Sequence, residues 1–116
     1  MGVASSREPS MAAKSFVDGL IQSSKVVVFS KSYCPYCHKA KSALESQGMA
    51  PNVMQWVEID GREDMDDIQN YLGQLTGARS VPRVFINQKF FGGGDDTARA
   101  AKTGDLARLL KEAGAL

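Results

Sequence analysis

The stretch Ser32-Tyr33-Cys34-Pro35-Tyr36-Cys37-His38 contains the only two cysteines among the 116 residues of the chain. A β-branched and aromatic run at residues 25–30 precedes it and predicts a buried strand. Residues 39–44 follow it with the spacing of a helix. The two cysteines are therefore predicted to lie where a strand turns into a helix.

Pro35 indicates where that helix begins, because proline is favoured in a first turn, where its missing N–H needs no partner. Cys34 is then the expected cap residue, and Cys37 lies inside the first turn. Free backbone N–H groups and the helix dipole favour an anion there, and Lys31 adds positive charge, so the thiolate of Cys34 is expected to be stabilised. We interpret Cys34 as the nucleophile and Cys37 as the resolving thiol that attacks a mixed disulfide formed on Cys34.

Two other uses of a cysteine pair fit the sequence less well. Structural zinc needs four ligands, and the chain adds only His38, which directly follows Cys37. A structural disulfide across so short a loop stabilises little, and secreted scaffolds contain more cysteines. A redox-active dithiol is therefore favoured, and no metal is expected.

The composition is that of one small globular domain, with 43% hydrophobic residues. The net charge is +1, from 14 basic and 13 acidic residues, so no nucleic-acid partner is indicated. No apolar stretch approaches a membrane span of roughly 18 residues, and the N-terminus lacks the apolar core of a secretory signal. We expect a cytoplasmic protein, since free thiols persist in that compartment.

Small and polar residues at positions 1–10 predict a flexible N-terminal extension ahead of a folded domain at 11–116. Gly2, with Ser6 four residues further on, fits the pattern for N-myristoylation. A single acyl chain would give only marginal, reversible membrane attachment. The alternative is a leader without a lipid.

The remaining periodicity predicts alternating strands and helices. Strands are expected at 25–30, 54–59, 82–86 and 89–91, and helices at 11–21, 35–47, 63–75, 98–102 and 106–113. The first two strands are expected to be parallel because a helix connects them, and Asn87-Gln88 predicts an antiparallel hairpin for the last two. Ser10 and Asp105 are candidate helix caps, and Gly77 a helix end.

Two loops are candidates for ligand contact. Pro82 opens a strand, and a cis bond before it would leave the N–H and C=O of Val81 free to pair with a bound peptide. Residues 92–94 are glycines that lead toward a helix, whose N-terminus binds anions. No Gly-Lys-Ser/Thr follows, so this is not a phosphate loop, and Asp95 or Asp96 is alternatively a simple helix cap.

Three motifs, in this order, resemble those of the dithiol glutaredoxin family. A Cys-x-x-Cys pair alone is shared with thioredoxins, but thioredoxins typically have tryptophan where this chain has Tyr33. The resemblance extends from about Phe16 to the C-terminus and implies an α/β, thioredoxin-like fold with a four-stranded mixed sheet flanked by about five helices. The motifs are Cys34-Pro35-Tyr36-Cys37, residues 75–86 around Val81-Pro82, and Gly92-Gly93 followed by Asp95-Asp96.

The resemblance also implies glutathione as the reducing co-substrate. The binding residues that it implies are Lys31, Gln69 and Arg79 at the glycine carboxylate, Tyr36 beside the sulfur, Val81 and Pro82 along the cysteinyl backbone, and Asp95 and Asp96 at the γ-glutamyl end. Without the resemblance, Gln69 would be only a surface polar residue and Arg79 a partner for a nearby acidic side chain. The chain departs from many relatives at Gly94-Asp95, where they place cysteine or serine and then a hydroxyl residue. An extra aspartate there is expected to weaken the binding of a carboxylate.

By the same resemblance, Cys34 alone would reduce protein–glutathione mixed disulfides, and Cys34 with Cys37 would reduce protein disulfides. The partners would be glutathione, glutathionylated or disulfide-containing proteins and, indirectly, the glutathione reductase system, with the chain itself a monomer. A different class of function is an iron–sulfur carrier, a dimer that holds a [2Fe–2S] cluster through one cysteine of each subunit and two glutathiones. Pro35 disfavours it, because cluster-binding relatives usually lack a proline after the nucleophile.

Overall fold

The computed structural model describes residues 8–116. Gly2, the predicted acylation site, lies outside the described residues, as does most of the predicted extension at 1–10, whose boundary stays a prediction. The elements, in chain order, are α1 (Met11–Ser23), β1 (Val26–Ser30), α2 (Pro35–Glu45), β2 (Met54–Glu58), α3 (Met65–Thr76), β3 (Arg83–Ile86), β4 (Lys89–Gly92), α4 (Gly94–Thr103) and α5 (Asp105–Glu112).

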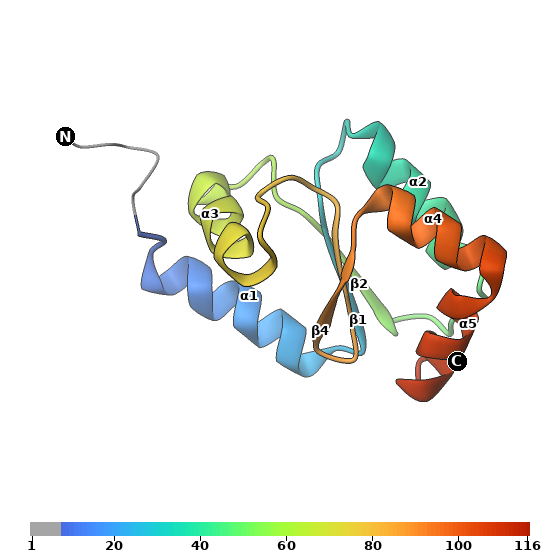
Figure 1. The fold of residues 1–116 in the computed structure, drawn as a ribbon. Helices are drawn as coiled ribbons and strands as arrows, with labels where there is room; N and C mark the ends of the chain where they lie inside the picture. The colour runs from blue at the N-terminus through green and yellow to red at the C-terminus, as the bar shows by residue number, and fades with distance from the viewer. Residues whose placement is uncertain (1–7) are drawn as a thin grey trace.

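The four strands form one mixed sheet in the order β2-β1-β3-β4 (Figure 1). β1 runs parallel to β2, with Val28 opposite Trp56, and antiparallel to β3, with Val28 also opposite Val84. β3 and β4 form the antiparallel hairpin that the sequence predicts. The predicted thioredoxin-like sheet is thus confirmed, and β1, which leads to the cysteines, is one of its two central strands.

Helices cover both faces of this sheet, α1 and α3 on one side and α2, α4 and α5 on the other (Figure 1). Successive side chains of a strand point to opposite faces, so β1 contributes to two cores. Val26 and Val28 pack with Leu44 of α2, and Val27 and Phe29 pack on the other face. The second core is completed by Ala13, Val17, Ile21, Ile59, Ile68, Leu72 and Phe85. All five residues of β1 are buried, which anchors the turn that follows them.

Only one of the two residues in the hairpin turn is of a type that favours the observed backbone conformation. Asn87 and Gln88 both have positive φ, 55° and 67°, as a two-residue turn with the twist of a hairpin requires. Asparagine tolerates that conformation, whereas glutamine is not the favoured glycine. The side chain of Gln88 donates to the carbonyl of Gln22 at 3.3 Å, which attaches the hairpin to the end of α1.

The predicted start of α4 at residue 98 is wrong, because the helix begins at Gly94. The glycines and aspartates ahead of it have low helix propensity and predict a loop. In the structure Gly93 is the cap, and the carboxylate of Asp96 accepts its N–H at 3.1 Å. This bond satisfies a donor that an early helix start would otherwise leave unpaired.

Asp105 is not a cap either. Gly104 ends α4 and precedes α5. Its φ of 89° is a left-handed conformation that glycine adopts without strain. Ser10 does cap α1, with its side chain accepting the N–H of Ala13, and Gly77 ends α3, as predicted. The other predicted element ends differ from the observed ones by about one or two residues.

The start of α4 packs directly on the first turn of α2. A Cβ at Gly94 would lie 2.5 Å from the carbonyl oxygen of Tyr36 and 3.1 Å from its Cβ. No side chain fits there without backbone movement. The absence of a side chain at Gly94 therefore allows the backbone of residues 93–96 to lie beside the cysteine turn.

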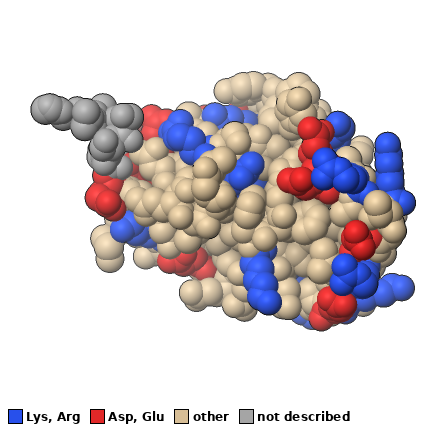
Figure 2. Space-filling model, in the orientation of Figure 1, with Lys and Arg blue, Asp and Glu red and all other residues tan. Residues whose placement is uncertain are grey.

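Acidic and basic side chains are interspersed on the surface shown in Figure 2, without a large region of one sign. This matches the net charge of +1. None of the helices within residues 8–116 is long and apolar enough to cross a membrane.

We expect Gly94→Ala to lower the free energy of unfolding by about 1–3 kcal/mol, the usual cost of overpacking, because the new methyl group meets the backbone of Tyr36. Urea unfolding checks this. Gly19→Ala in α1 is the matched control: a Cβ there meets nothing within 4 Å, so we expect this variant to gain up to about 1 kcal/mol in helix propensity. Equal stability of Gly94→Ala and wild type would contradict the close packing of α4 on α2.

Candidate active site

Cys34 caps α2 through its own side chain. Its Sγ accepts the backbone N–H of Cys37 at 3.2 Å, as the position of Pro35 predicts. The protonated thiol donates to the carbonyl oxygen of Val81, 3.7 Å away. The side chain is half-buried rather than enclosed. Cys34 therefore has the backbone donor that a thiolate needs and the exposure that an incoming disulfide needs.

Cys37 has the opposite surroundings one helical turn further on. Its side chain is fully buried. Burial, together with the hydrogen bond to Cys34, raises the pKa of Cys37 from an ordinary 9.0 to about 11. The thiol of Cys37 is therefore protonated at neutral pH, which suits a group that acts second.

The loop before β3 lies against Cys34. The Val81–Pro82 peptide bond is cis, which is the condition set out above for Val81 to face a bound peptide, and β3 begins directly after it. Val81 is half-buried, with its carbonyl facing the sulfur of Cys34. A peptide bound along Val81 would thus place its own cysteine next to Cys34.

The start of α4 forms the other side of the site. Asp96 accepts the N–H of Gly93 with one carboxylate oxygen and pairs with Arg99 at 3.2 Å through the other. The Gly93 N–H, with Arg99 and Arg83 nearby, holds the pKa of Asp96 below its ordinary value. Asp96 is therefore a fixed negative charge at the end of the site.

Asp95 is bound to α2 instead. Its carboxylate pairs with the ammonium of Lys39 at 2.7 Å, and Lys39 also lies 5.8 Å from the ring centroid of Tyr36. Tyr36 itself is 56% exposed beside the cysteines. The structure thus brings Cys34, Tyr36, Val81, Asp95 and Asp96 together.

Two predicted residues on and after α3 contact each other. The side-chain amide of Gln69 donates to the carbonyl of Arg79 at 2.8 Å, and Gln69 is buried, which excludes the view of it as a surface polar residue. The guanidinium of Arg79 donates to Asn70 at 3.1 Å and lies 3.7 Å from Asp66, the acidic partner anticipated as the alternative for Arg79.

Lys31 follows β1 and is half-buried ahead of the cysteine turn. Lys31 interacts electrostatically with Asp60, whose carboxylate accepts the hydroxyl of Ser32 at 2.5 Å and the N–H of Ser32 at 3.1 Å. The hydrogen bond from the Ser32 side chain is the main reason why the pKa of Asp60 lies below its ordinary value, and Lys31 adds a smaller effect. These contacts fix the backbone just before Tyr33 and Cys34.

Sequence reasoning missed Arg83, the first residue of β3. Its half-buried guanidinium donates to the carbonyl of Pro82 at 3.2 Å and lies 5.0 Å from the ring centroid of Phe90. It also reaches the hydroxyls of Ser80 and Thr76, at 3.4 and 3.5 Å. Burial lowers the pKa of Arg83. A charged residue inside an apolar strand was the available signal, and its contacts support the backbone around the cis bond.

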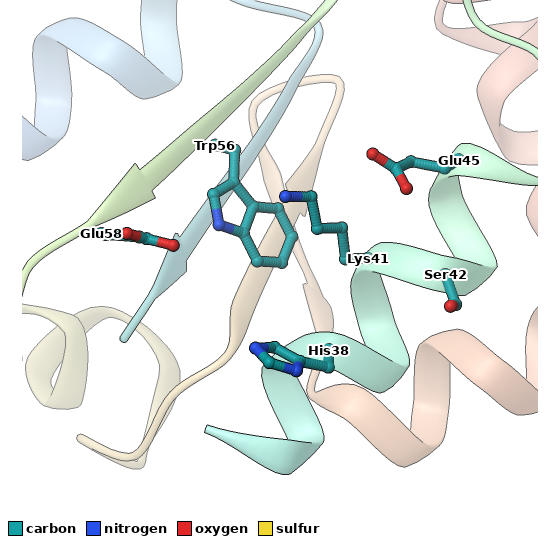
Figure 3. Close-up of a pocket in the computed structure, with 6 residues that line it drawn as sticks. All are labelled: His38, Lys41, Ser42, Glu45, Trp56 and Glu58. Atoms are coloured by element: carbon teal, nitrogen blue, oxygen red, sulfur yellow. The ribbon is translucent and has the colours of Figure 1, made fainter. Parts of the chain in front are cut away.

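A separate pocket of about 370 Å³ lies between α2 and β2 (Figure 3). Lys41 points from α2 toward Trp56, with its ammonium 5.3 Å from the centroid of the indole ring. His38 also lines the pocket, and its Nε2 lies 3.3 Å from the carbonyl oxygen of Ser32. The indole N–H of Trp56 has no hydrogen-bond partner within the described residues. Cys34 does not line this pocket, so the pocket is separate from the active site.

The fold and the cysteine turn define a dithiol oxidoreductase of the thioredoxin-like class. Comparison with known proteins specifies it further. The glutaredoxin family model matches residues 26–91. Glutaredoxin-C4 of Arabidopsis thaliana is 52% identical over 99 residues, which cover 85% of this chain and 71% of that protein.

Two solved structures are similar to this chain over 90% of its length. The crystal structure of oxidized glutaredoxin 2 from Chlamydomonas reinhardtii has a TM-score of 0.84 and 54% identity, with 96% of that chain covered. The buckwheat glutaredoxin–glutathione complex has a TM-score of 0.82 and 39% identity, with 93% covered. The chain belongs to the glutaredoxin family and is a thiol-disulfide oxidoreductase, as the motifs around its cysteines indicate.

We expect the raised pKa of Cys37 to make stability depend on pH. The unfolded thiol ionises near 9.0 and the folded one near 11, so the stability conferred by the buried thiol is complete below pH 9 and is lost as pH rises to about 11. Urea unfolding of Cys34→Ser and Cys34→Ser/Cys37→Ser at pH 7 to 11, with a reductant, measures it as the difference between the two variants. A difference that does not change over this range would contradict the burial of an un-ionised thiol at Cys37.

Proposed function

We propose that this glutaredoxin uses glutathione to reduce protein–glutathione mixed disulfides through Cys34 and protein disulfides through Cys34 and Cys37. The observation that supports this most directly is the contrast between the two thiols. Cys34 is accessible and accepts a backbone N–H, while Cys37 is buried and held un-ionised.

In the first route, the thiolate of Cys34 attacks the glutathione sulfur of the mixed disulfide. The bond to the protein substrate breaks, and the substrate leaves as a thiolate that takes a proton from solvent. A second glutathione thiolate then attacks the glutathione sulfur now attached to Cys34. Glutathione disulfide leaves, and the Cys34 thiolate, which again accepts the N–H of Cys37, is regenerated.

In the second route, Cys34 attacks a protein disulfide and forms a mixed disulfide with the protein. Cys37 must lose its proton before it attacks the sulfur of Cys34. The substrate then leaves as a thiolate that takes a proton from solvent, and two glutathione molecules reduce the resulting Cys34–Cys37 disulfide and leave as glutathione disulfide. A thiol with a pKa of about 11 supplies only about one thiolate in ten thousand molecules at pH 7. Deprotonation of Cys37 is therefore a required step of this route, which suits the thiol that acts second.

The residues around Cys34 include groups that suit each end of glutathione. The N–H groups at the start of α4 would bind the γ-glutamyl carboxylate, and Asp96 would bind its ammonium. The backbone of Val81, beside Pro82, would pair with the cysteinyl residue. The glutathione complex of the buckwheat relative supports a site of this kind.

At the glycine end, the residues proposed are Lys31, Gln69 and Arg79. The amide of Gln69 has two N–H donors and uses one on the carbonyl of Arg79, so one remains for a carboxylate. Arg79 is exposed, and its 3.7 Å pair with Asp66 is of the weak, solvated kind. Arg79 is therefore free to turn toward a ligand at little cost.

We also propose a cellular compartment, an oligomeric state and partners, each from the sequence alone. Reduction of disulfides by glutathione requires that its thiol be kept reduced, which favours the cytoplasm. The chain would act as a monomer, with glutathione reductase restoring its co-substrate. Its protein substrates would be glutathionylated or disulfide-containing proteins.

We expect Cys37→Ser to retain reduction of a glutathionylated peptide and to lose reduction of a protein disulfide, whereas Cys34→Ser loses both. The reason is that only the second route needs a second thiol on the enzyme. The measurement is NADPH oxidation in the presence of glutathione and glutathione reductase, for wild type and the two variants, with circular dichroism to verify folding.

Loss of both activities in folded Cys37→Ser would contradict the route that uses Cys34 alone. A folded but inactive wild type would contradict the whole proposal. Colour after anaerobic reconstitution with iron, sulfide and glutathione would then favour a cluster carrier, and reduction by another electron donor would favour a thioredoxin-like reductase.

A further inference from the structure

Lys39 and Asp95 form an ion pair between two helices at the edge of the active site. The ammonium of Lys39, on α2, lies 2.7 Å from a carboxylate oxygen of Asp95, on α4. Both side chains are about half-exposed, at 50% and 58%. The bond to Asp95 also raises the pKa of Lys39, which keeps its ammonium charged at neutral pH.

The position of the pair places it beside the groups proposed for the γ-glutamyl end of glutathione. Asp95 is the second residue of α4, next to Asp96, and the N-terminus of α4 is pressed against the backbone of Tyr36 by the close approach at Gly94. Lys39 lies 5.8 Å from the ring centroid of Tyr36. Both charges of the pair are therefore close enough to interact electrostatically with a carboxylate that binds at the start of α4.

A role in holding α4 onto α2 does not explain the pair. Exposed ion pairs contribute little to stability, because water screens them and both side chains lose freedom. The contact between the two helices is made instead by Gly94 against Tyr36, and by Ala40, Leu44 and Ala100 in the shared core.

We propose that Lys39 neutralises Asp95 and thereby sets the affinity of the site for a γ-glutamyl carboxylate. An unpaired carboxylate at Asp95 would repel that group, whereas the pair presents no net charge to it. Lys39 is thus a specificity-determining residue of this chain, and it compensates for the aspartate that departs from many relatives. This inference rests on the proposed function, since it concerns the same glutathione site.

Four proteins separate this electrostatic role from a structural one. The net charge at the pair is zero in wild type, −1 in Lys39→Met, +1 in Asp95→Asn and zero in the double variant. At 5 to 6 Å in water, one unit charge changes the affinity for a carboxylate by about threefold. With a glutathionylated peptide, we expect kcat/KM to fall about threefold in Lys39→Met and to rise by a similar factor in Asp95→Asn. The double variant is expected to return to near the wild-type value.

Three controls accompany the measurement. Lys89→Met removes an exposed lysine from β4, at the hairpin end of the sheet, and is expected to leave kcat/KM unchanged. Salt at about 1 M should shrink the differences among the four proteins, because the Debye length falls to about 3 Å. A substrate in which the γ-glutamyl carboxylate is converted to an amide should remove their ranking, since the charge that the pair acts on is gone.

If both single variants lose activity and the double variant recovers none, the pair has a structural role and the inference is wrong. Equal kcat/KM in all four proteins would also overturn it, while the proposed function would stand on the activity of the wild type. A wild type that does not reduce the glutathionylated peptide would overturn the proposed function and this inference with it.

Discussion

The hydrogen bond from the N–H of Cys37 to the sulfur of Cys34 is the interaction on which the rest of the site depends. It exists because Pro35 begins α2 directly after Cys34, so that the sulfur takes the place of a cap side chain. The strand β1 determines where this turn lies, because its buried side chains pack into the cores on both faces of the sheet. The thiol proposed as the nucleophile therefore has a hydrogen-bond donor from the backbone of the same helix that contains its proposed resolving partner.

The same turn separates the chemistry of two identical side chains. Cys34 and Cys37 are three residues apart, yet one is half-exposed and accepts a backbone donor, and the other faces the core. Burial makes ionisation of Cys37 costly, which fits the role in the second step that we propose for its thiol. The difference between the two thiols arises from the direction in which each side chain leaves the helix, rather than from any difference in the residues themselves.

Segments far apart in the chain complete the site around this turn. The loop before β3 places the carbonyl of Val81 beside Cys34. The guanidinium of Arg83 donates a hydrogen bond to the carbonyl of Pro82 in the same loop. α4 approaches because Gly94 has no side chain to collide with Tyr36. The close approach of α4 also brings Asp95 within 2.7 Å of Lys39 on α2, the ion pair that we propose neutralises a charge unfavourable for an anionic ligand.

The sequence by itself determined what depends on neighbours along the chain. The cap at Cys34, the cap at Ser10, the parallel crossover from β1 to β2 and the hairpin at Asn87-Gln88 all follow from local patterns and were predicted correctly. The tertiary structure alone decided what depends on partners distant in sequence: the burial of Gln69 and the pair of Lys39 with Asp95, 56 residues away. The physical reason is that propensity and capping act over about one helical turn, whereas burial and charge pairing are settled only when the helices pack against the sheet.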